Sequence, residues 1–242
     1  MRAALARGVQ QGEGMPLAQA PRLLEPGDQA LEDGVLRNPD GTLLIAVRTE
    51  MPGVTGEMFD WWFGWHLTSS ERYRLWHPRD HVRATVEEDR SYLSDDRERY
   101  VGNVSYVDEY IGGRLMKLAI EFVPPTLYGL EPGRFAEARV DTAVCARTAF
   151  QGWPLAVGHL IHLVRRVPGG CELRSRFWLG DIEVRLPVLG GPLSRLLNRA
   201  PLRRRVAPDG LGLGLLVHCA EEMNHLARLL PGLYRAFPRP GP

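Results

Sequence analysis

Two side chains that could bind a metal ion lie near the end of the chain, in LGLLVHCAEEMNHLARLLPGLY (213–234). His218 and Glu222 are four residues apart, so on a helix they project from the same side. An imidazole and a carboxylate at this spacing can bind one divalent ion. Taken alone, such a pair is more often a polar contact on a helix surface, which stabilises the helix by a few tenths of a kcal/mol. A metal site therefore requires ligands from other segments.

His225 is not expected to be one of these ligands. Glu222 and His225 form an ExxH pair, which supplies ligands in di-iron bundles, but that arrangement requires a second ExxH helix, and the sequence contains none. We expect His225 to face solvent or to lie outside the ligand set.

Two earlier segments offer more ligand candidates. In ERYRLWHPRDH, Pro78 disfavours helical geometry at His77, so only one of His77 and His81 is expected to face a shared site. In VDEYIGG, Asp108 and Glu109 point to opposite faces of a strand, so one of them faces inward unless the strand lies at a solvated sheet edge.

The elements that must position these residues are predicted from hydrophobic period. Alternating apolar and polar residues predict two antiparallel hairpins, at 101–125 and 158–180. LLIAVRTEM (43–51) is typical of a strand, and the aromatic run GEMFDWWFGWHL (56–67) of a buried helix. Hairpins closed by a long C-terminal helix predict an α+β domain, in which a curved antiparallel sheet surrounds that helix above a cavity.

The chain divides at about residue 43. Residues 1–42 are rich in Gly, Pro and Ala, and are expected to form an irregular N-terminal lead-in that wraps the domain formed by residues 43–242. The aromatic segment DWWFGWH is expected in the core or in a homodimer interface, with His66 as a structural histidine.

The composition excludes several classes of partner. The 30 basic and 29 acidic residues give a net charge of +1, which provides no general attraction to nucleic acid or to an anionic membrane. No apolar run approaches the roughly 20 residues that span a bilayer. Three widely spaced cysteines suit a reducing compartment better than a disulfide framework, so we expect a cytoplasmic protein.

Five motifs occur in an order that identifies a family: DWWFGWH, RYRLWHPRDH, DEYIGGRLMKL, CELRSRFWLG and HCAEEMNHLARLLP. Over about residues 43–235 the chain resembles the diacetylphloroglucinol and phloretin hydrolases. The resemblance implies a Bet v1-like helix-grip domain with a smaller N-terminal part. It also implies a zinc-dependent hydrolase that cleaves the carbon–carbon bond between an acyl group and a phloroglucinol-type ring.

The same resemblance implies the site residues. Zn²⁺ would be bound by His81, Glu109, His218 and Glu222, while Tyr73 and His162 would be the catalytic residues, facing a small aromatic ketone substrate as acid/base or hydrogen-bonding groups. If the alignment of this segment with the family is shifted, His159 takes the place of His162. The sequence departs from the family at Ala84, where a polar amide side chain is expected three residues after the first ligand histidine.

The alternative function is a non-enzymatic helix-grip protein that binds hydrophobic, polyketide-like ligands. In that case His218 and Glu222 would be only a polar wall of the cavity, and the protein would contain no metal.

Overall fold

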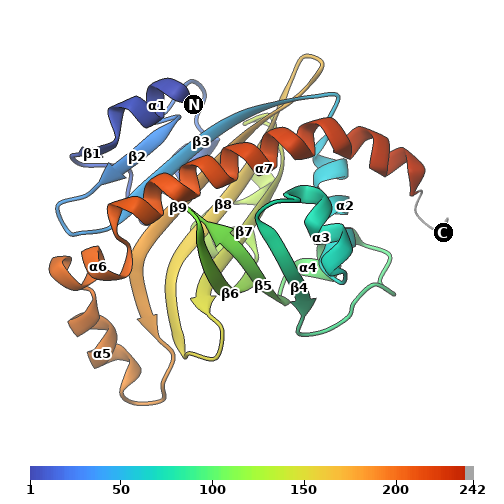
Figure 1. The fold of residues 1–242 in the computed structure, drawn as a ribbon. Coiled ribbons are helices and arrows are strands. Elements are labelled where there is room, and N and C mark those ends of the chain that lie inside the picture. The colour runs from blue at the N-terminus through green and yellow to red at the C-terminus, as the bar shows by residue number, and fades with distance from the viewer. Residues whose placement is uncertain (238–242) are drawn as a thin grey trace.

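A nine-stranded sheet and one long helix organise the chain (Figure 1). The computed structural model describes residues 1–237. The strand order is β1-β2-β3-β9-β8-β7-β6-β5-β4, and neighbouring strands are antiparallel except for the parallel pair β1 and β2. The strands are β1 (Val9–Gln11), β2 (Gly34–Arg37), β3 (Leu43–Pro52), β4 (His81–Val86), β5 (Val104–Ile111), β6 (Arg114–Val123), β7 (Val140–Phe150), β8 (Leu155–Val167) and β9 (Gly170–Val184).

Helix α7 (Asp209–Ala236) lies across one face of the curved sheet (Figure 1), and the predicted α+β helix-grip architecture is confirmed. No helix within residues 1–237 is long and apolar enough to cross a lipid bilayer. The other helices, including the 3-10 helices η1 to η3, are α1 (Arg2–Arg7), η1 (Leu17–Leu24), α2 (Gly56–His66), α3 (Ser70–Trp76), α4 (Asp96–Tyr100), η2 (Pro125–Tyr128), η3 (Pro132–Arg134), α5 (Gly190–Leu197) and α6 (Ala200–Val206).

Both predicted hairpins are present, as β5–β6 and β8–β9. On β6 the alternate residues Leu118, Ile120 and Phe122 face a cavity beneath α7, as the period of two requires. On β9, Phe177 and Leu179 face the same cavity. The cavity that positions the site is therefore formed by the alternation that the sequence displays.

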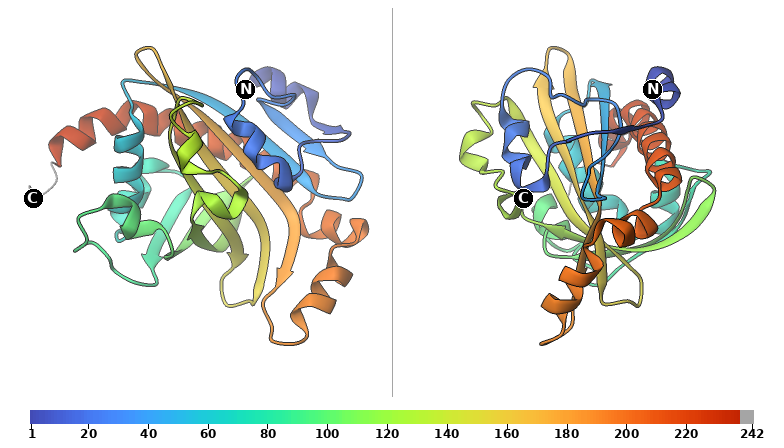
Figure 2. Two further views of the ribbon diagram at one scale, coloured as in Figure 1. Left: turned by 180° about the vertical axis from the view of Figure 1, so that it is seen from behind. Right: turned by 90° about the vertical axis from the view of Figure 1, so that its left-hand side faces the viewer.

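Residues 1–42 differ from the expected irregular lead-in, because they contain α1, η1 and the strands β1 and β2, which extend the sheet. The division of the chain at residue 43 stays a prediction. Figure 2 shows α7 on one face of the sheet and part of this N-terminal segment on the other. There it covers Arg174 and Arg176, which neither line the cavity nor face water: Arg176 donates to Glu32 (2.6 Å) and Arg174 to the Gly27 carbonyl (2.9 Å).

The aromatic helix α2 belongs to the core. It begins after Thr55, whose hydroxyl accepts a hydrogen bond from the Met58 backbone N–H and so caps the helix. Trp61, Trp62 and Phe63 are all at least 97% buried and pack among the other core residues. The cysteines are also buried, and no disulfide joins them in the described part of the chain.

Shortening a core side chain of α7 is expected to destabilise the whole domain. Leu226 is fully buried in the core, so Leu226→Ala should lower the free energy of unfolding by about 2–5 kcal/mol. Urea unfolding measures this change. Arg228→Ala, on the exposed side of the same helix, should leave it within about 0.5 kcal/mol of the wild type, and equal losses in both variants would contradict the packing described here.

Candidate active site

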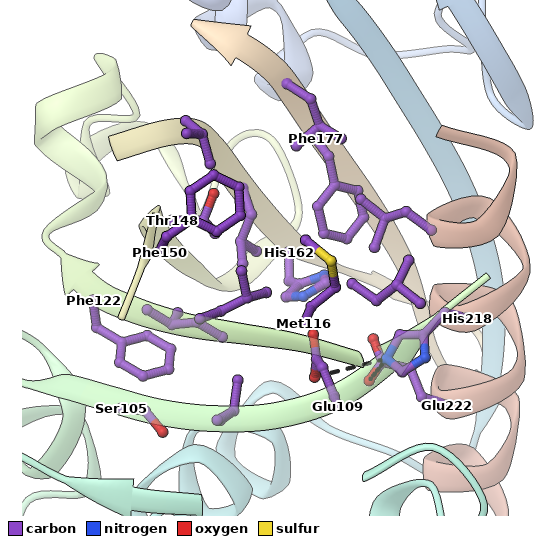
Figure 3. Close-up of a pocket in the computed structure, with 18 of the residues that line it drawn as sticks. Ser105, Glu109, Met116, Phe122, Thr148, Phe150, His162, Phe177, His218 and Glu222 are labelled. Carbon is purple, nitrogen blue, oxygen red and sulfur yellow. Dashed lines mark ion pairs between the residues drawn. The ribbon is translucent and has the colours of Figure 1, made fainter. Parts of the chain in front are cut away.

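Four of the sequence-predicted residues lie together at one end of the cavity. His81 begins β4 and is paired across the sheet with Glu109 on β5, while His218 and Glu222 face them from adjacent turns of α7. The His81 Nε2 atom lies 3.3 Å from His218 Nε2 and 3.4 Å from Glu222 Oε2. Glu109 Oε2 lies 3.7 Å from His81 Nε2 and 3.9 Å from His218 Nε2. Figure 3 shows Glu109, His218 and Glu222 pointing toward one another.

The geometry of this cluster fits a metal ion. Ligand atoms about 2.0–2.1 Å from a tetrahedral zinc ion are separated by roughly 3.3 Å, close to the shortest separations here. The His81 Nδ1–H donates to the Tyr73 carbonyl (3.0 Å), so its Nε2 presents a lone pair to the cluster. His218 also directs its Nε2 at that point, so the two ring nitrogens can bind one cation or share a proton.

The charges of the cluster lead to the same conclusion. Burial, with Glu109 nearby, raises the pKa of Glu222 to about 8, although His218 partly offsets this. Burial lowers the pKa of His81, which favours the neutral imidazole that binds metals. His81, His218 and Glu222 form a buried group that could bind a metal ion.

The outer side of His218 faces a second polar group. Its Nδ1 is buried without a hydrogen bond to any residue of 1–237, and the carboxylate oxygen Asp80 Oδ2 lies 3.5 Å away. The ring of His77 stacks on that of His218 at 5.0 Å, while its Nε2 lies 3.3 Å from Glu221. His81 thus lies inside the cluster and His77 outside it. Metal-binding histidines commonly place a carboxylate where Asp80 lies, next to the second ring nitrogen.

Tyr73 connects this cluster to α3. Its ring stacks on His81 at 3.8 Å, and its hydroxyl donates to Glu109. Burial and the charge of Glu109 raise the pKa of Tyr73 well above its ordinary value, so the phenol stays protonated. Helix α3 ends at Trp76, just before Pro78, and the turn that follows brings the chain back to His81.

The chain matches a family model described as "DAPG hydrolase PhiG domain" over residues 15–235. It is 35% identical over 223 residues to a 2,4-diacetylphloroglucinol hydrolase from Pseudomonas sp, with 90% of this chain and 76% of that protein covered. The chain belongs to the DAPG hydrolase family.

Other comparisons reach more distant proteins. The chain is 32% identical to the phloretin hydrolase of Eubacterium ramulus, over 81% of this chain and 68% of that protein. A major latex-like protein of Panax ginseng aligns over 77% of this chain and 99% of its own, with 16% identity and a TM-score of 0.39. The named relatives confirm the predicted hydrolase class over the non-enzymatic alternative.

His162 faces the cavity of this family member from β8, whereas His159 does not. The His159 ring lies on the outer face of the sheet, where it hydrogen-bonds to Tyr128 (3.0 Å) and Asp181 (3.1 Å). His162 lines the cavity among aromatic side chains, and its Nδ1 lies 2.8 Å from Ser175 Oγ. Burial lowers the pKa of His162 to about 3, so the imidazole is neutral at pH 7 and carries a proton on only one of its ring nitrogens.

Ser175 is a polar residue of the site that the motifs did not single out. It pairs with His162 across β8 and β9 and is fully buried. The alternation on β9 placed it on the cavity face, but only the register of the two strands puts its hydroxyl opposite the imidazole. Its hydrogen bond to Nδ1 leaves Nε2 of His162 directed elsewhere in the cavity.

Removing the Ser175 hydroxyl is expected to slow turnover without changing the metal content of the protein. In Ser175→Ala the His162 ring loses the partner that orients it, so we expect kcat/KM to fall about 10-fold, which is the worth of one such hydrogen bond. Steady-state kinetics and metal analysis measure the two effects. Ser70→Ala removes a hydroxyl that hydrogen-bonds to the backbone of Ala84, away from His162, and is the matched control. A loss of the same size there would contradict the role of Ser175.

Two buried neutral histidines predict sensitivity to acid. Burial lowers the pKa of both His66 and His162 to about 3, while in the unfolded chain each titrates near 6.5. Below pH 6.5 only the unfolded chain takes up these protons, so each residue should cost about 2 kcal/mol of stability between pH 7 and pH 5.

Urea unfolding at pH 7 and pH 5 tests this. We expect His66→Gln, which removes one of the two titrations, to lose about 2 kcal/mol less than the wild type over this interval. An identical loss in the variant and the wild type would show that His66 is not neutral in the folded protein.

Proposed function

We propose that this chain is a zinc-dependent hydrolase that cleaves the carbon–carbon bond between an acyl group and a phloroglucinol-type ring. The observation that supports this best is the buried cluster of two imidazoles and two carboxylates, which lies at one end of an otherwise largely apolar cavity. Such a cavity suits an aromatic ketone, and this donor set suits zinc. His81, Glu109, His218 and Glu222 would bind the ion.

The overall reaction consumes one water molecule. The ring carbon that carries the acyl group takes a proton from a ring hydroxyl, water adds to the acyl carbonyl, and the bond between these two carbons breaks. Its electron pair returns to the ring as a phenolate, which takes up the proton that the added water releases, and the acyl group leaves as a carboxylic acid. When bound, zinc would supply positive charge to a substrate oxygen and lower the pKa of water toward about 7.

The roles of the protein groups follow from their protonation. Tyr73 keeps its proton, so its hydroxyl can donate to Glu109 or to a substrate oxygen. His162 is neutral at pH 7, so it can hydrogen-bond to a substrate oxygen or accept a proton from water during the reaction. Aromatic side chains around His162 shield it from bulk water.

The test is a cleavage assay with purified protein. Acetylphloroglucinol and 3-(4-hydroxyphenyl)propanoyl-phloroglucinol should each yield phloroglucinol and the matching carboxylic acid, chelation should stop the reaction, and added zinc should restore it. Full turnover after exhaustive chelation would contradict zinc dependence, and cleavage of neither compound would contradict the substrate class. A cytoplasmic location and a homodimer stay predictions of the sequence.

A further inference from the structure

Two neighbouring turns expose large apolar side chains at one end of the sheet. Trp153 lies between β7 and β8 and is 70% exposed, while Val188 and Leu189 lie between β9 and α5 and are 93% and 59% exposed. The Arg185 backbone N–H donates to the Pro154 carbonyl (2.8 Å), so the two turns lie side by side. Both turns lie at the lower end of the sheet in Figure 1. We call Trp153, Val188 and Leu189 the apolar tip.

Val188 has a backbone conformation that valine rarely adopts. Its φ angle is 64°, in the left-handed region, where a β-branched side chain is strained. The side chain is almost fully exposed, so its packing does not offset this strain. The fold thus holds an apolar side chain in solvent at a conformational cost, as is typical of segments that bind a ligand or partner.

The segment around and after this turn is strongly basic. Residues 184–208 contain six arginines and no aspartate or glutamate, although the whole chain has 30 basic and 29 acidic residues. Two of the six are paired, Arg185 with Glu121 and Arg203 with Asp40. The other four are exposed and form no ion pair with any residue of 1–237, and they are Arg195, Arg199, Arg204 and Arg205. Their charge is available to an anionic partner, although the chain as a whole is nearly neutral.

Helix α5 connects the apolar tip to these arginines. The Val184 backbone N–H donates to the Ser194 hydroxyl (2.8 Å), so that side of the helix faces β9. Arg195 and Leu196 are on the side that faces solvent, where Leu196 is 45% exposed. Helix α6 follows α5 at the same end of the molecule, as Figures 1 and 2 show. Apolar and cationic side chains are therefore exposed together there.

We propose that this end of the molecule binds peripherally to an anionic lipid bilayer. The apolar tip would enter the boundary between headgroups and acyl chains, and the four unpaired arginines would contact lipid phosphates. Tryptophan and aliphatic side chains beside arginines are the composition that binds this boundary. The apolar side chains project from turns instead of lining a groove, so they suit a fluid bilayer better than the fixed surface of a second protein.

The bilayer would then lie near the cavity beneath α7. Arg204, Arg205 and Val206 are consecutive residues of α6, and Val206 lines that cavity. An apolar compound dissolved in the membrane would therefore be close to the site when the protein is bound.

The experiment measures flotation of the full chain with two kinds of vesicle. One contains phosphatidylcholine alone, and the other contains phosphatidylcholine and phosphatidylglycerol in equal parts. We expect the wild type to bind the anionic vesicles at least about 10-fold more tightly, and added salt to weaken this binding. Each arginine near such a surface strengthens binding about 5-fold, so Arg204→Gln combined with Arg205→Gln should weaken it about 25-fold. Trp153→Ser should weaken it about 10-fold.

Matched controls change the same kinds of side chain elsewhere. Arg228→Gln combined with Arg235→Gln removes two exposed arginines from the other end of α7, and Tyr92→Ser removes an aromatic side chain that is 75% exposed. Both should bind within about 2-fold of the wild type. Tryptophan fluorescence measures insertion directly, because the emission should shift to shorter wavelength with anionic vesicles in the wild type and not in Trp153→Phe.

Three results would overturn the proposal: no binding of the wild type to anionic vesicles, equal binding to neutral ones, or losses in the controls as large as in the variants of this surface. A stable dimer in lipid-free solution that Trp153→Ser dissociates would also overturn it, because the surface would then join two copies of the chain. These measurements require no cleavage of any substrate, so membrane binding and the proposed function can fail separately.

Discussion

Replacing Glu222 by Gln is expected to remove bound zinc and hydrolytic activity together, each by about 100-fold or more. The carboxylate lies 3.4 Å from His81 Nε2 and 3.7 Å from His218 Nε2, so its oxygen completes the donor set that faces the proposed ion. The amide of Gln keeps the size of the side chain but is neutral and a weaker ligand, so the cluster loses one of its two anionic donors.

The control for this variant lies next to it on α7. Glu221→Gln changes an exposed carboxylate that pairs with Arg79, outside the cluster. We expect it to keep one equivalent of zinc and near-wild-type turnover. Elemental analysis and an assay on the same preparations measure both quantities. Zinc and activity retained in Glu222→Gln, or lost equally in Glu221→Gln, would contradict the assignment of Glu222 as a ligand.

Replacing the two groups proposed to face the substrate, His162 and Tyr73, is expected to lower turnover without removing the proposed metal. We expect His162→Ala and Tyr73→Phe each to lower kcat by about 10²–10⁴, the range that positioned proton donors and acceptors contribute. His162 is not among the proposed ligands, so zinc content should be unchanged in His162→Ala. Tyr73→Phe removes the hydrogen bond to Glu109, so a modest loss of zinc affinity is also expected.

His159→Ala is the matched control for His162→Ala. Both histidines belong to β8, but the His159 ring lies on the outer face of the sheet, where it hydrogen-bonds to Tyr128 and Asp181. Its loss should leave kcat within about 2-fold of the wild type. If His162→Ala and Tyr73→Phe both kept near-wild-type turnover on every cleaved acylphenol, neither residue would act in the reaction.

The sequence pattern predicted the strands and the helix that carry the site. It predicted less well which of these elements lie next to one another in space. The alternation along β6 and β9 predicted which side chains face the cavity, and the spacing of His218 and Glu222 predicted their shared face of α7. These are properties of one strand or one helix, and they depend only on the period of the element.

The gathering of the four predicted ligands has a different origin. It depends on the register that pairs His81 with Glu109 and on the position of α7 across the sheet, which no single segment encodes. The sequence motifs supplied those residues through their resemblance to a family. Their convergence within 3.3–3.9 Å is a property of the fold.

Residues whose surroundings come from distant segments were the hardest to predict. Arg174 and Arg176 alternate with apolar residues, as cavity or solvent positions would, yet the N-terminal segment covers them on the outer face. The neutral state of His162 likewise results from aromatic side chains of α2 and β9 packed around its ring. Ser175 lies within the motif CELRSRFWLG, but its place beside His162 appears only once the register of β8 and β9 is known.

The most direct test of this account is a crystal structure of the purified protein with diffraction data collected on both sides of the zinc absorption edge. We predict one anomalous peak per chain, about 2.0–2.2 Å from His81 Nε2, His218 Nε2 and an oxygen each of Glu109 and Glu222. A fully formed cluster without a peak from protein crystallised with added zinc would contradict the central claim, as would a peak located instead between His77 and Asp80.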